Sequence, residues 1–256
     1  MTTKPQLRII NVSKRYANGS AVLDDFSLDI ANDDFVAFIG PRGCGKSTIL
    51  RLLAGLTPLS GGNIEHLGGE EIHRRTSFIF QEPTLLPWRT VESNIRLPLE
   101  LRGASKDEQE DQAHEIMKLW ELSHVSERYP LQLSAGMKTR ASLARGLATA
   151  PRCLLLDEPF AALDAITRNK LCVELMRVRE KRHFTACLVT HSAAEAVFLA
   201  NRVIVLTANP GRVAEIIEVP ETHPRKLAWR ETNAFQEALN QVRNALNRVQ
   251  EAAKQS

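Results

Sequence analysis

The sequence lacks long hydrophobic runs. No stretch approaches the roughly 18 consecutive apolar residues that suggest a membrane-spanning helix. The first residues, Met1 to Pro5, are followed by no apolar segment of the kind that forms the core of a secretory signal. These absences predict a soluble chain that is not exported. Its 256 residues are enough for one large domain or two small domains.

Charge of one sign and paired cysteines are also missing. The 33 Lys and Arg residues against 30 Asp and Glu residues leave a formal net charge of +3, which is too balanced to indicate a nucleic-acid partner. The cysteines form no C-x-x-C pair, and we predict neither a disulfide nor a zinc site. Cys153 and Cys187 are expected in buried strands, which is typical of small apolar residues in a reducing compartment.

The most informative stretch runs from Gly40 to Thr48 and matches the pattern G-x-x-x-x-G-K-[ST] in full. An apolar run at 35–39 precedes it and apolar residues at helical spacing follow it, so the motif is expected between a strand and a helix. There, backbone N–H groups and the helix dipole bind phosphate, Lys46 reaches the β- and γ-phosphates, and Ser47 ligates Mg²⁺. The predicted nucleotide-binding residues of this loop are Gly40, Pro41, Arg42, Gly43, Cys44, Gly45, Lys46, Ser47 and Thr48.

Strand and helix signals alternate on both sides of this loop. The expected strands are 7–13, 21–30, 35–39, 76–80, 153–158, 185–190, 202–207 and 213–219. Such an alternation around a glycine-rich loop predicts an α/β fold with a largely parallel sheet and a ligand at the carboxyl edge of the sheet. The pair Gly61 and Gly62 is interpreted as a turn after the first helix.

The composition changes between residues 82 and 148. Four prolines, Pro98 among them, break this stretch, and a charged segment at 106–122 is predicted to be helical with its apolar residues on one side. We therefore expect a nucleotide-binding core at 1–81 and 149–222, a helical insert at 82–148, and a helical tail at 223–256.

The tail contains an apolar stripe at helical spacing. We interpret it as core packing, with a partner-binding face as the less favoured alternative. Its members are Phe235, Ala238, Leu239, Val242, Leu246 and Val249.

Polar side chains follow several of the expected strands. Asp157 and Glu158 end an apolar strand, where Asp157 can hold Mg²⁺ and Glu158 can polarise the water that attacks a γ-phosphoryl group. Gln81 and His191 also follow strands, and the Gln81 amide can reach into a nucleotide site. Tyr16 lies in a turn-rich link, where its ring could stack on a purine base or pack on the sheet edge.

The stretch LSAGMKTR at 133–140 resembles the LSGGQ signature of ATP-binding cassette (ABC) proteins. From Leu7 to about Val219, the other motifs take the places that this family gives them, in the same order. The resemblance identifies Tyr16 as the adenine-stacking residue, Gln81 as the Q-loop, Asp157 and Glu158 as the Walker B pair, 161–164 with Asp164 as the D-loop, and His191 as the switch histidine.

This resemblance implies an ABC ATPase architecture: a P-loop core with a largely parallel sheet, an antiparallel N-terminal β subdomain and a helical insert that carries the signature. The implied cofactors are ATP and Mg²⁺. Ser134, Ala135 and Gly136 of one subunit would cover the ATP held by another, which implies a head-to-tail dimer. The implied catalytic residues are Lys46, Gln81, Glu158 and His191, and the implied metal-binding residues are Ser47, Gln81 and Asp157.

Three positions depart from the family pattern. Ala135 stands where the signature has its first glycine, and its methyl group could crowd a backbone that must approach phosphate, which would slow hydrolysis. Met137 replaces a glutamine, and Ser192 follows His191 where an aspartate is usual. Neither of these two changes removes a catalytic group.

Residues 82–94 look like the corresponding segment of importer ATPases for nitrate, sulfonate, taurine and related small anions, as do residues 209–213. This implies a protein peripheral to the inner face of the cell membrane that powers uptake through a separate permease. An external solute-binding protein would act indirectly, and no nucleic acid would be involved. Leu85, Leu86 and Trp88 would either line a groove for a permease helix or pack the core of the insert.

Two alternatives to transport are also considered. A soluble cassette ATPase acting on ribosomes or DNA usually carries two cassettes or a long coiled-coil insertion, and this sequence has one cassette and no heptad run. The second alternative, a nucleotide-binding subunit with weak hydrolysis, is supported by Ala135 alone. We therefore favour an importer ATPase.

Overall fold

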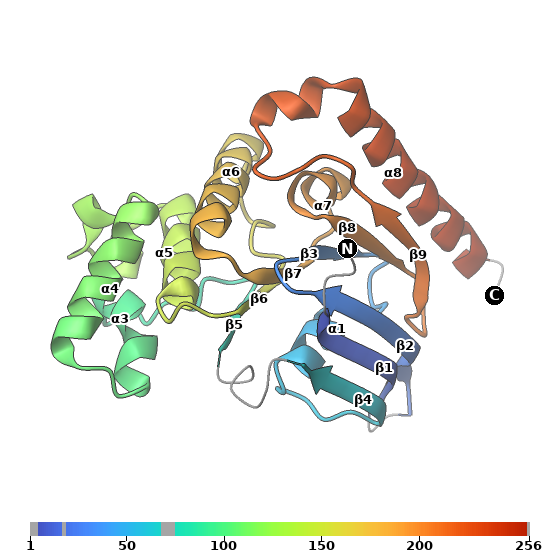
Figure 1. The fold of residues 1–256 in the computed structure, drawn as a ribbon, viewed down its shortest axis with the longest axis horizontal. Helices are drawn as coiled ribbons and strands as arrows, with labels where there is room; N and C mark the ends of the chain where they lie inside the picture. Colours follow the sequence, from blue (N-terminus) through green and yellow to red (C-terminus); the bar gives the residue numbers. More distant parts are fainter. Residues whose placement is uncertain (1–4, 17–18, 68–74, 255–256) are drawn as a thin grey trace.

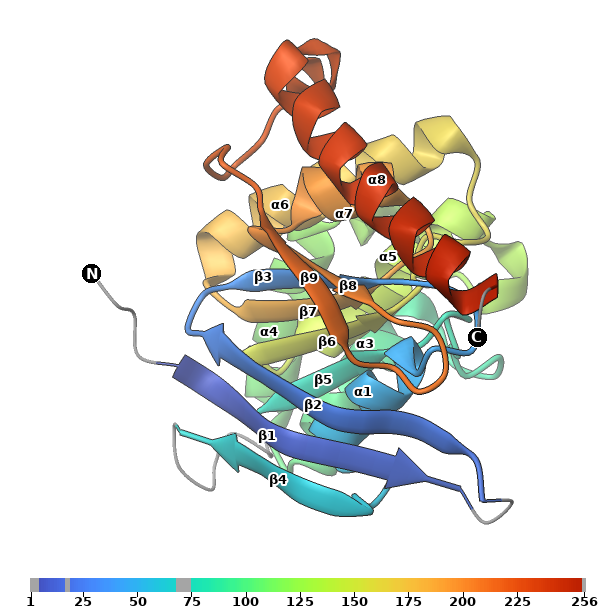
Figure 2. The same ribbon diagram turned by 90° about the vertical axis from the view of Figure 1, so that its right-hand side faces the viewer.

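The computed structural model describes residues 5–16, 19–67 and 75–254. Within these ranges the strands form a sheet of three and a sheet of six. The smaller sheet is antiparallel, with the order β2-β1-β4 (Figure 2). Its strands are β1 (Pro5–Arg15), β2 (Ala21–Ala31) and β4 (Gly61–His66). The antiparallel N-terminal β subdomain is confirmed.

Strand β4 shows that the interpretation of Gly61 and Gly62 as a turn was wrong. The pair begins a strand that runs antiparallel to β1. Gly62 has a φ of 80°, and a Cβ at this position would overlap the carbonyl oxygens of Ile10 and Asn11. The glycine therefore allows β4 to approach β1 where the register shifts, because no other residue combines that φ with so close a contact.

The larger sheet has the order β5-β6-β7-β3-β8-β9. Its first five strands run parallel, and β9 is antiparallel to β8. The strands are β5 (Thr76–Ile79), β6 (Cys153–Asp157), β7 (Thr185–Val189), β3 (Phe35–Ile39), β8 (Arg202–Leu206) and β9 (Val213–Glu218). Every residue of β3, β6 and β7 is buried, as continuous apolar runs require in a sheet covered on both faces. The expected strands end within two residues of the observed ones.

Helix α1 (Lys46–Leu53) lies between the two sheets (Figure 2). Its apolar side chains share one buried cluster with Leu7 and Phe26 of the small sheet and with Phe38 of the large sheet. The opposite face of the large sheet is covered by α6 (Ala165–Arg182), α7 (Ala193–Leu199) and α8 (Asn233–Lys254). This arrangement leaves the loop at the start of α1 at the carboxyl edge of β3.

The insert contributes three helices at one side of the molecule, coloured green in Figure 1. They are α3 (Val91–Leu101), α4 (Lys106–Leu119) and α5 (Ala135–Leu147). Helix α4 ends at Leu119 and not at residue 122, because Glu121 takes a left-handed φ of 55°. Helix α3 continues through Pro98. Burial of Ile95 and Leu99 on either side of Pro98 stabilises the helix despite the missing N–H group.

The tail ends in α8, whose predicted apolar stripe is confirmed as core packing. Phe235 and Val242 are buried, and Leu246 and Val249 pack partly buried against the same cluster. Before α8, the buried Arg225 guanidinium donates hydrogen bonds to the carbonyl oxygens of Val197 (2.7 Å) and Ala200 (2.8 Å) at the end of α7. No helix in the described part of the chain is both long enough and apolar enough to span a bilayer.

Candidate functional site

The phosphate-binding loop connects β3 to α1, as predicted. Gly45, immediately before the helix, has a φ of 94°, and a Cβ there would lie 2.8 Å from Leu23 Cδ2. Only glycine satisfies both constraints. The turn places the free N–H groups of the first helical turn at the mouth of the loop, where an anion is favoured.

Lys46 extends along this loop. Its Nζ atom donates hydrogen bonds to the carbonyl oxygens of Gly40 (2.9 Å) and Pro41 (2.8 Å). Cys44 Sγ lies 3.7 Å from the same Nζ atom, and burial raises the pKa of this thiol, which therefore stays protonated and packs as an apolar residue. The ammonium group is thus held at the loop by neutral acceptors, and its charge remains available to an anion.

A hydroxyl and a carboxylate meet beside the loop. Ser47 Oγ donates a hydrogen bond of 2.7 Å to Asp157 Oδ1, although the two residues are far apart in the sequence. Asp157 is the last residue of β6 and pairs with Val189 of β7, so its place is fixed by the parallel register. Hard oxygen ligands of this kind fit Mg²⁺, which takes one or two protein ligands and completes its shell with phosphate oxygens and water.

Glu158 and His191 face each other across adjacent strand ends. The distance from His191 Nε2 to Glu158 Oε1 is 2.6 Å. Glu158 has a left-handed φ of 49°, and its backbone N–H donates to the Val189 carbonyl oxygen at 2.9 Å. A non-glycine residue held in this conformation is strained, a feature that clusters at active sites. Here it turns the carboxylate from the strand toward the histidine.

Lys46, Ser47, Glu158 and His191 line one cavity of about 650 Å³ at the carboxyl edge of the large sheet, and Asp157 lies behind its wall in contact with Ser47. Its wall is formed by Tyr16, Val22, Arg42, Gly43, Gly45, Lys46, Ser47, Thr48, Gln81, Glu158, Ala161 and His191. The structure therefore brings together the predicted phosphate loop, the predicted base, Gln81 and the predicted switch histidine. Val22 was not predicted, because a small apolar residue carries no chemical signal in a sequence, and Ala161 was identified only as the first residue of the D-loop.

Tyr16 lies at the edge of the cavity. Its hydroxyl oxygen is 3.4 Å from Thr48 Oγ1, and the Lys14 ammonium lies 5.2 Å from the centre of its ring. The residue is 39 % exposed. Its ring is thus held by contacts on one side and partly open on the other, a geometry compatible with stacking on a base.

The signature lies apart from this cavity. Ser134 is the N-cap of α5, and its hydroxyl accepts a hydrogen bond from the Met137 N–H at 3.3 Å. Ser134 and Ala135 are exposed. A Cβ on Gly136 would lie 2.8 Å from Thr167 Cγ2 of α6, so this glycine is also needed for the packing of the two helices. None of these three signature residues belongs to the cavity wall of the same chain.

Asp164 is likewise placed outside the cavity. It is the N-cap of α6 and accepts hydrogen bonds from the N–H groups of Ile166 and Thr167, each at 3.0 Å. The bonds to Thr167 and then Ile166 lower the pKa of this carboxyl group. Within one chain Asp164 therefore caps a helix, and a contact of Asp164 with nucleotide stays a prediction.

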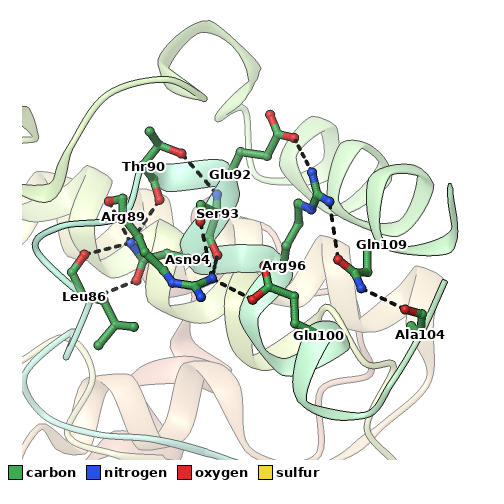
Figure 3. A network of polar contacts seen from close by, with 10 residues as sticks. All are labelled: Leu86, Arg89, Thr90, Glu92, Ser93, Asn94, Arg96, Glu100, Ala104 and Gln109. Atoms are coloured by element: carbon green, nitrogen blue, oxygen red, sulfur yellow. Dashed lines mark hydrogen bonds and ion pairs between the residues drawn. The ribbon is translucent and has the colours of Figure 1, made fainter. Parts of the chain in front are cut away.

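The segment after Gln81 presents an exposed aromatic ring on a rigid support. Trp88 is 71 % exposed, so the alternative in which it packs the core of the insert is wrong for this residue. The fully buried Asn94 holds the turn beneath it: its Oδ1 accepts from the Leu86 N–H (2.8 Å), and its Nδ2 donates to the carbonyl oxygens of Leu86 (3.1 Å) and Arg89 (3.0 Å). Arg89 also pairs with Glu100 at 2.8 Å (Figure 3).

Comparison with known proteins gives a consistent result. The profile of the ABC transporter family matches residues 23–161. The fold and the site are those of an ATP-binding cassette ATPase, and the chain belongs to the ABC transporter family. A solved structure, the "dimeric structure of a post-hydrolysis state of the ATP-binding cassette MJ0796 bound to ADP and Pi", has a TM-score of 0.72 and 31 % identity, and the match covers 84 % of this chain and 100 % of that one.

Several curated relatives have names that describe transport. An "uncharacterized ABC transporter ATP-binding protein MJ0412" of Methanocaldococcus jannaschii is 43 % identical over 87 % of this chain and 85 % of its own. An "aliphatic sulfonates import ATP-binding protein SsuB 1" of Mesorhizobium japonicum is 46 % identical over 84 % and 80 %. A "nitrate import ATP-binding protein NrtC" of Synechococcus elongatus is 41 % identical over 90 % of this chain and 36 % of its own.

Proposed function

We propose that this chain is the ATP-hydrolysing subunit of an importer for a small anion. The relatives named for sulfonate and nitrate import support the branch of the family. The transport partner would be a separate membrane permease, which places the chain at the inner face of the membrane, with an external solute-binding protein delivering the anion. The observation that carries the catalytic part is the contact of 2.6 Å between Glu158 and His191 in the wall that also contains Lys46 and Ser47.

The residues divide the work of phosphoryl transfer. The loop amides and Lys46 bind the phosphates, and Ser47 and Asp157, assisted by Gln81, provide the oxygen ligands for Mg²⁺. When bound, Mg²⁺ neutralises charge on the phosphates. Glu158 accepts a proton from the attacking water, and His191, a neighbour of that carboxylate, orients the pair and balances charge as the γ-phosphoryl group is transferred to water. The products are ADP and phosphate.

We also propose that two copies share their sites. Ser134 and Ala135 are exposed at the start of α5 and do not reach the cavity of their own chain, so the free N–H groups of this helix can serve an ATP held by a second copy. The dimeric neighbour supports this arrangement. Ala135, one of the three departures from the family pattern, presents its methyl group at the exposed end of the helix, where it would crowd the phosphate and slow hydrolysis.

The test of the catalytic part is Glu158→Gln, which keeps the shape of the side chain and removes its basicity. We expect ATP turnover to fall by about 10²-fold or more, the scale of general-base catalysis, while ATP binding is retained. Glu237→Gln on the exposed face of α8 is the matched control and should behave like the parent chain. Parent-level turnover in Glu158→Gln would show that another group acts as the base.

A further inference from the structure

A continuous set of contacts joins the chain after Glu158 to the chain around His191. We call it the circuit, and it runs from Glu158 through Leu163, Arg168, Glu195 and Thr190 to His191. After Glu158 the backbone makes two turns, in which the Ala161 N–H donates to the Glu158 carbonyl oxygen (3.1 Å) and the Leu163 N–H donates to the Phe160 carbonyl oxygen (3.2 Å). Leu163 is 6 % exposed. These turns fix the path from the proposed base to the start of α6.

Arg168, in the first turns of α6, binds both sides of this circuit. Its Nη2 atom donates a hydrogen bond of 2.6 Å to the Leu163 carbonyl oxygen, which anchors the turns after Glu158. Its Nε atom lies 3.2 Å from Glu195 Oε1 on α7, an ion pair with a residue that is only 5 % exposed. Arg168 Nε makes no hydrogen bond, so its contact with Glu195 is an ion pair alone, whereas Nη2 makes a directed hydrogen bond to Leu163. The rigid guanidinium group spans both partners, which a lysine ammonium on a flexible stem cannot do as well.

Glu195 also contacts a residue beside His191. Its second oxygen, Oε2, accepts a hydrogen bond of 2.6 Å from the Thr190 hydroxyl. The Thr190 oxygen in turn accepts from the Ser192 N–H at 3.0 Å, and the Ser192 hydroxyl accepts from the Glu195 N–H at 3.2 Å. The buried Glu195 carboxylate therefore holds Thr190 directly, whereas Ser192 is held by the Thr190 hydroxyl and by the Glu195 backbone N–H.

The charge state of Glu195 depends on this pairing. Burial and, to a smaller extent, the charge of Glu158 raise the pKa of its carboxyl group, whereas the hydrogen bond from Thr190 and the charges of Arg168 and Arg230 lower it. Removing one of the two cations that act on this buried carboxylate is costly, so loss of Arg168, with Arg230 remaining, would favour protonation or displacement of Glu195. The circuit is closed at the catalytic end by the contact of 2.6 Å between His191 Nε2 and Glu158 Oε1.

We propose that Arg168 is a positioning residue that sets the spacing of Glu158 and His191, acting through Leu163 on one side and Glu195 on the other. This role rests on the functions proposed above for Glu158 and His191. Arg168 and Glu195 do not belong to the wall of the nucleotide cavity. Their replacement should therefore change the rate of hydrolysis with little change in ATP binding. A residue that only holds two helices together, with no effect on Glu158 and His191, would not lower the rate of hydrolysis while leaving ATP binding unchanged.

The test compares variants of the purified chain with Mg²⁺ and ATP. We expect Arg168→Met to lower kcat about tenfold, because residues that act through a network of contacts typically change a coupled step by about this factor. KM for ATP should stay within about twofold of the parent value, because Arg168 does not line the nucleotide cavity. Arg182→Met is the matched control, because Arg182 also lies on α6 and forms an ion pair, with Glu115 at 3.0 Å, and neither residue lines the cavity. It should keep parent-level kcat.

Two further variants separate positioning from folding. Arg168→Lys can satisfy Glu195 or Leu163 but not both, and we expect it to fold and to lose about threefold in kcat, less than Arg168→Met. Adding Glu195→Gln to Arg168→Met should cost nothing more, because both changes cut the same link. The comparison of Arg168→Lys with the parent keeps the test decisive where Arg168→Met lowers the melting temperature or fails to fold.

The outcomes distinguish this proposal from the one it rests on. Parent-level kcat in folded Arg168→Met or Arg168→Lys, with Glu158→Gln inactive, would overturn the positioning role and leave the proposed base in place. Equal losses of kcat in Arg168→Met and Arg182→Met would also overturn it, because they would show a general effect of weakening α6. Normal turnover in Glu158→Gln would overturn both proposals.

Discussion

Trp88 offers the sharpest test of how this chain meets a membrane partner. The perturbation is Trp88→Ala, in the turn that follows Gln81. Because the residue is 71 % exposed, truncation removes few internal contacts, and we expect the free energy of unfolding to change by less than about 0.5 kcal/mol. Trp120 in the same insert is fully buried, and Trp120→Ala should cost about 3–5 kcal/mol.

For binding to the permease we expect the reverse: the exposed Trp88, and not the buried Trp120, should make the larger direct contribution to affinity. A rigid aromatic anchor at the centre of an interface typically contributes about 2 kcal/mol or more, which corresponds to about 30-fold in Kd. The support under Trp88 is rigid in this sense, because Asn94 is fully buried and its side chain bonds to Leu86, Arg89 and Thr90 (Figure 3). Little conformational entropy would therefore be lost on docking.

The assay measures thermal unfolding of the free chain and its affinity for the permease that co-purifies with the parent. The control is Leu101→Ala, which removes another apolar side chain of the insert, 80 % exposed at the end of α3. We expect Trp88→Ala alone to weaken the complex. If its melting temperature falls as far as that of Trp120→Ala, or if its Kd equals that of Leu101→Ala, Trp88 does not anchor the permease.

Two further predictions concern nucleotide binding and assembly. Lys46→Ala should weaken ATP binding about tenfold or more in a direct binding titration, because it removes the charged donor of the loop and also its bonds to Gly40 and Pro41; unchanged affinity would contradict that role. In a Glu158→Gln background, light scattering should show a dimer with ATP but not with ADP, and Ser134→Arg should prevent it. Ser105→Arg, at the similarly capped start of α4, should leave it intact, and equal effects of both arginines would contradict a shared site.

The central part of the site was predictable because it is local in sequence. The conformation of the loop from Gly40 to Thr48 is determined by nearby residues: an apolar segment on each side, glycines at the turns and a lysine at the helix start. Asp157 and Glu158 were found for a similar reason, since they end an apolar run that can only be a buried strand. The parallel register then brings them to Ser47 and His191, as the class of fold requires.

The parts that were missed depend on contacts between distant segments. Glu195 follows Ser192 at the spacing of a capping box, which predicts a helix start but not that the carboxylate turns away to Thr190 and Arg168. Gly62 was interpreted from its turn propensity, whereas its close approach to Asn11 decides its conformation. Trp88 was compatible with a core or a surface position, because an apolar residue in a proline-rich segment has no periodicity to decide its side.

One such contact connects features that the sequence treats as separate motifs. Arg145, on the signature helix α5, donates hydrogen bonds to the Pro83 carbonyl oxygen (3.1 Å), the Thr84 carbonyl oxygen (2.9 Å) and the Thr84 hydroxyl (2.9 Å). Thr84 has a left-handed φ of 46° and lies between Gln81 and Trp88. The turn after the cavity residue Gln81 is therefore fastened to the helix that begins at Ser134. The hydrogen bonds of Arg145 are thus contacts through which a nucleotide-dependent shift of Gln81, if it moved this turn, would reach both the signature helix and Trp88.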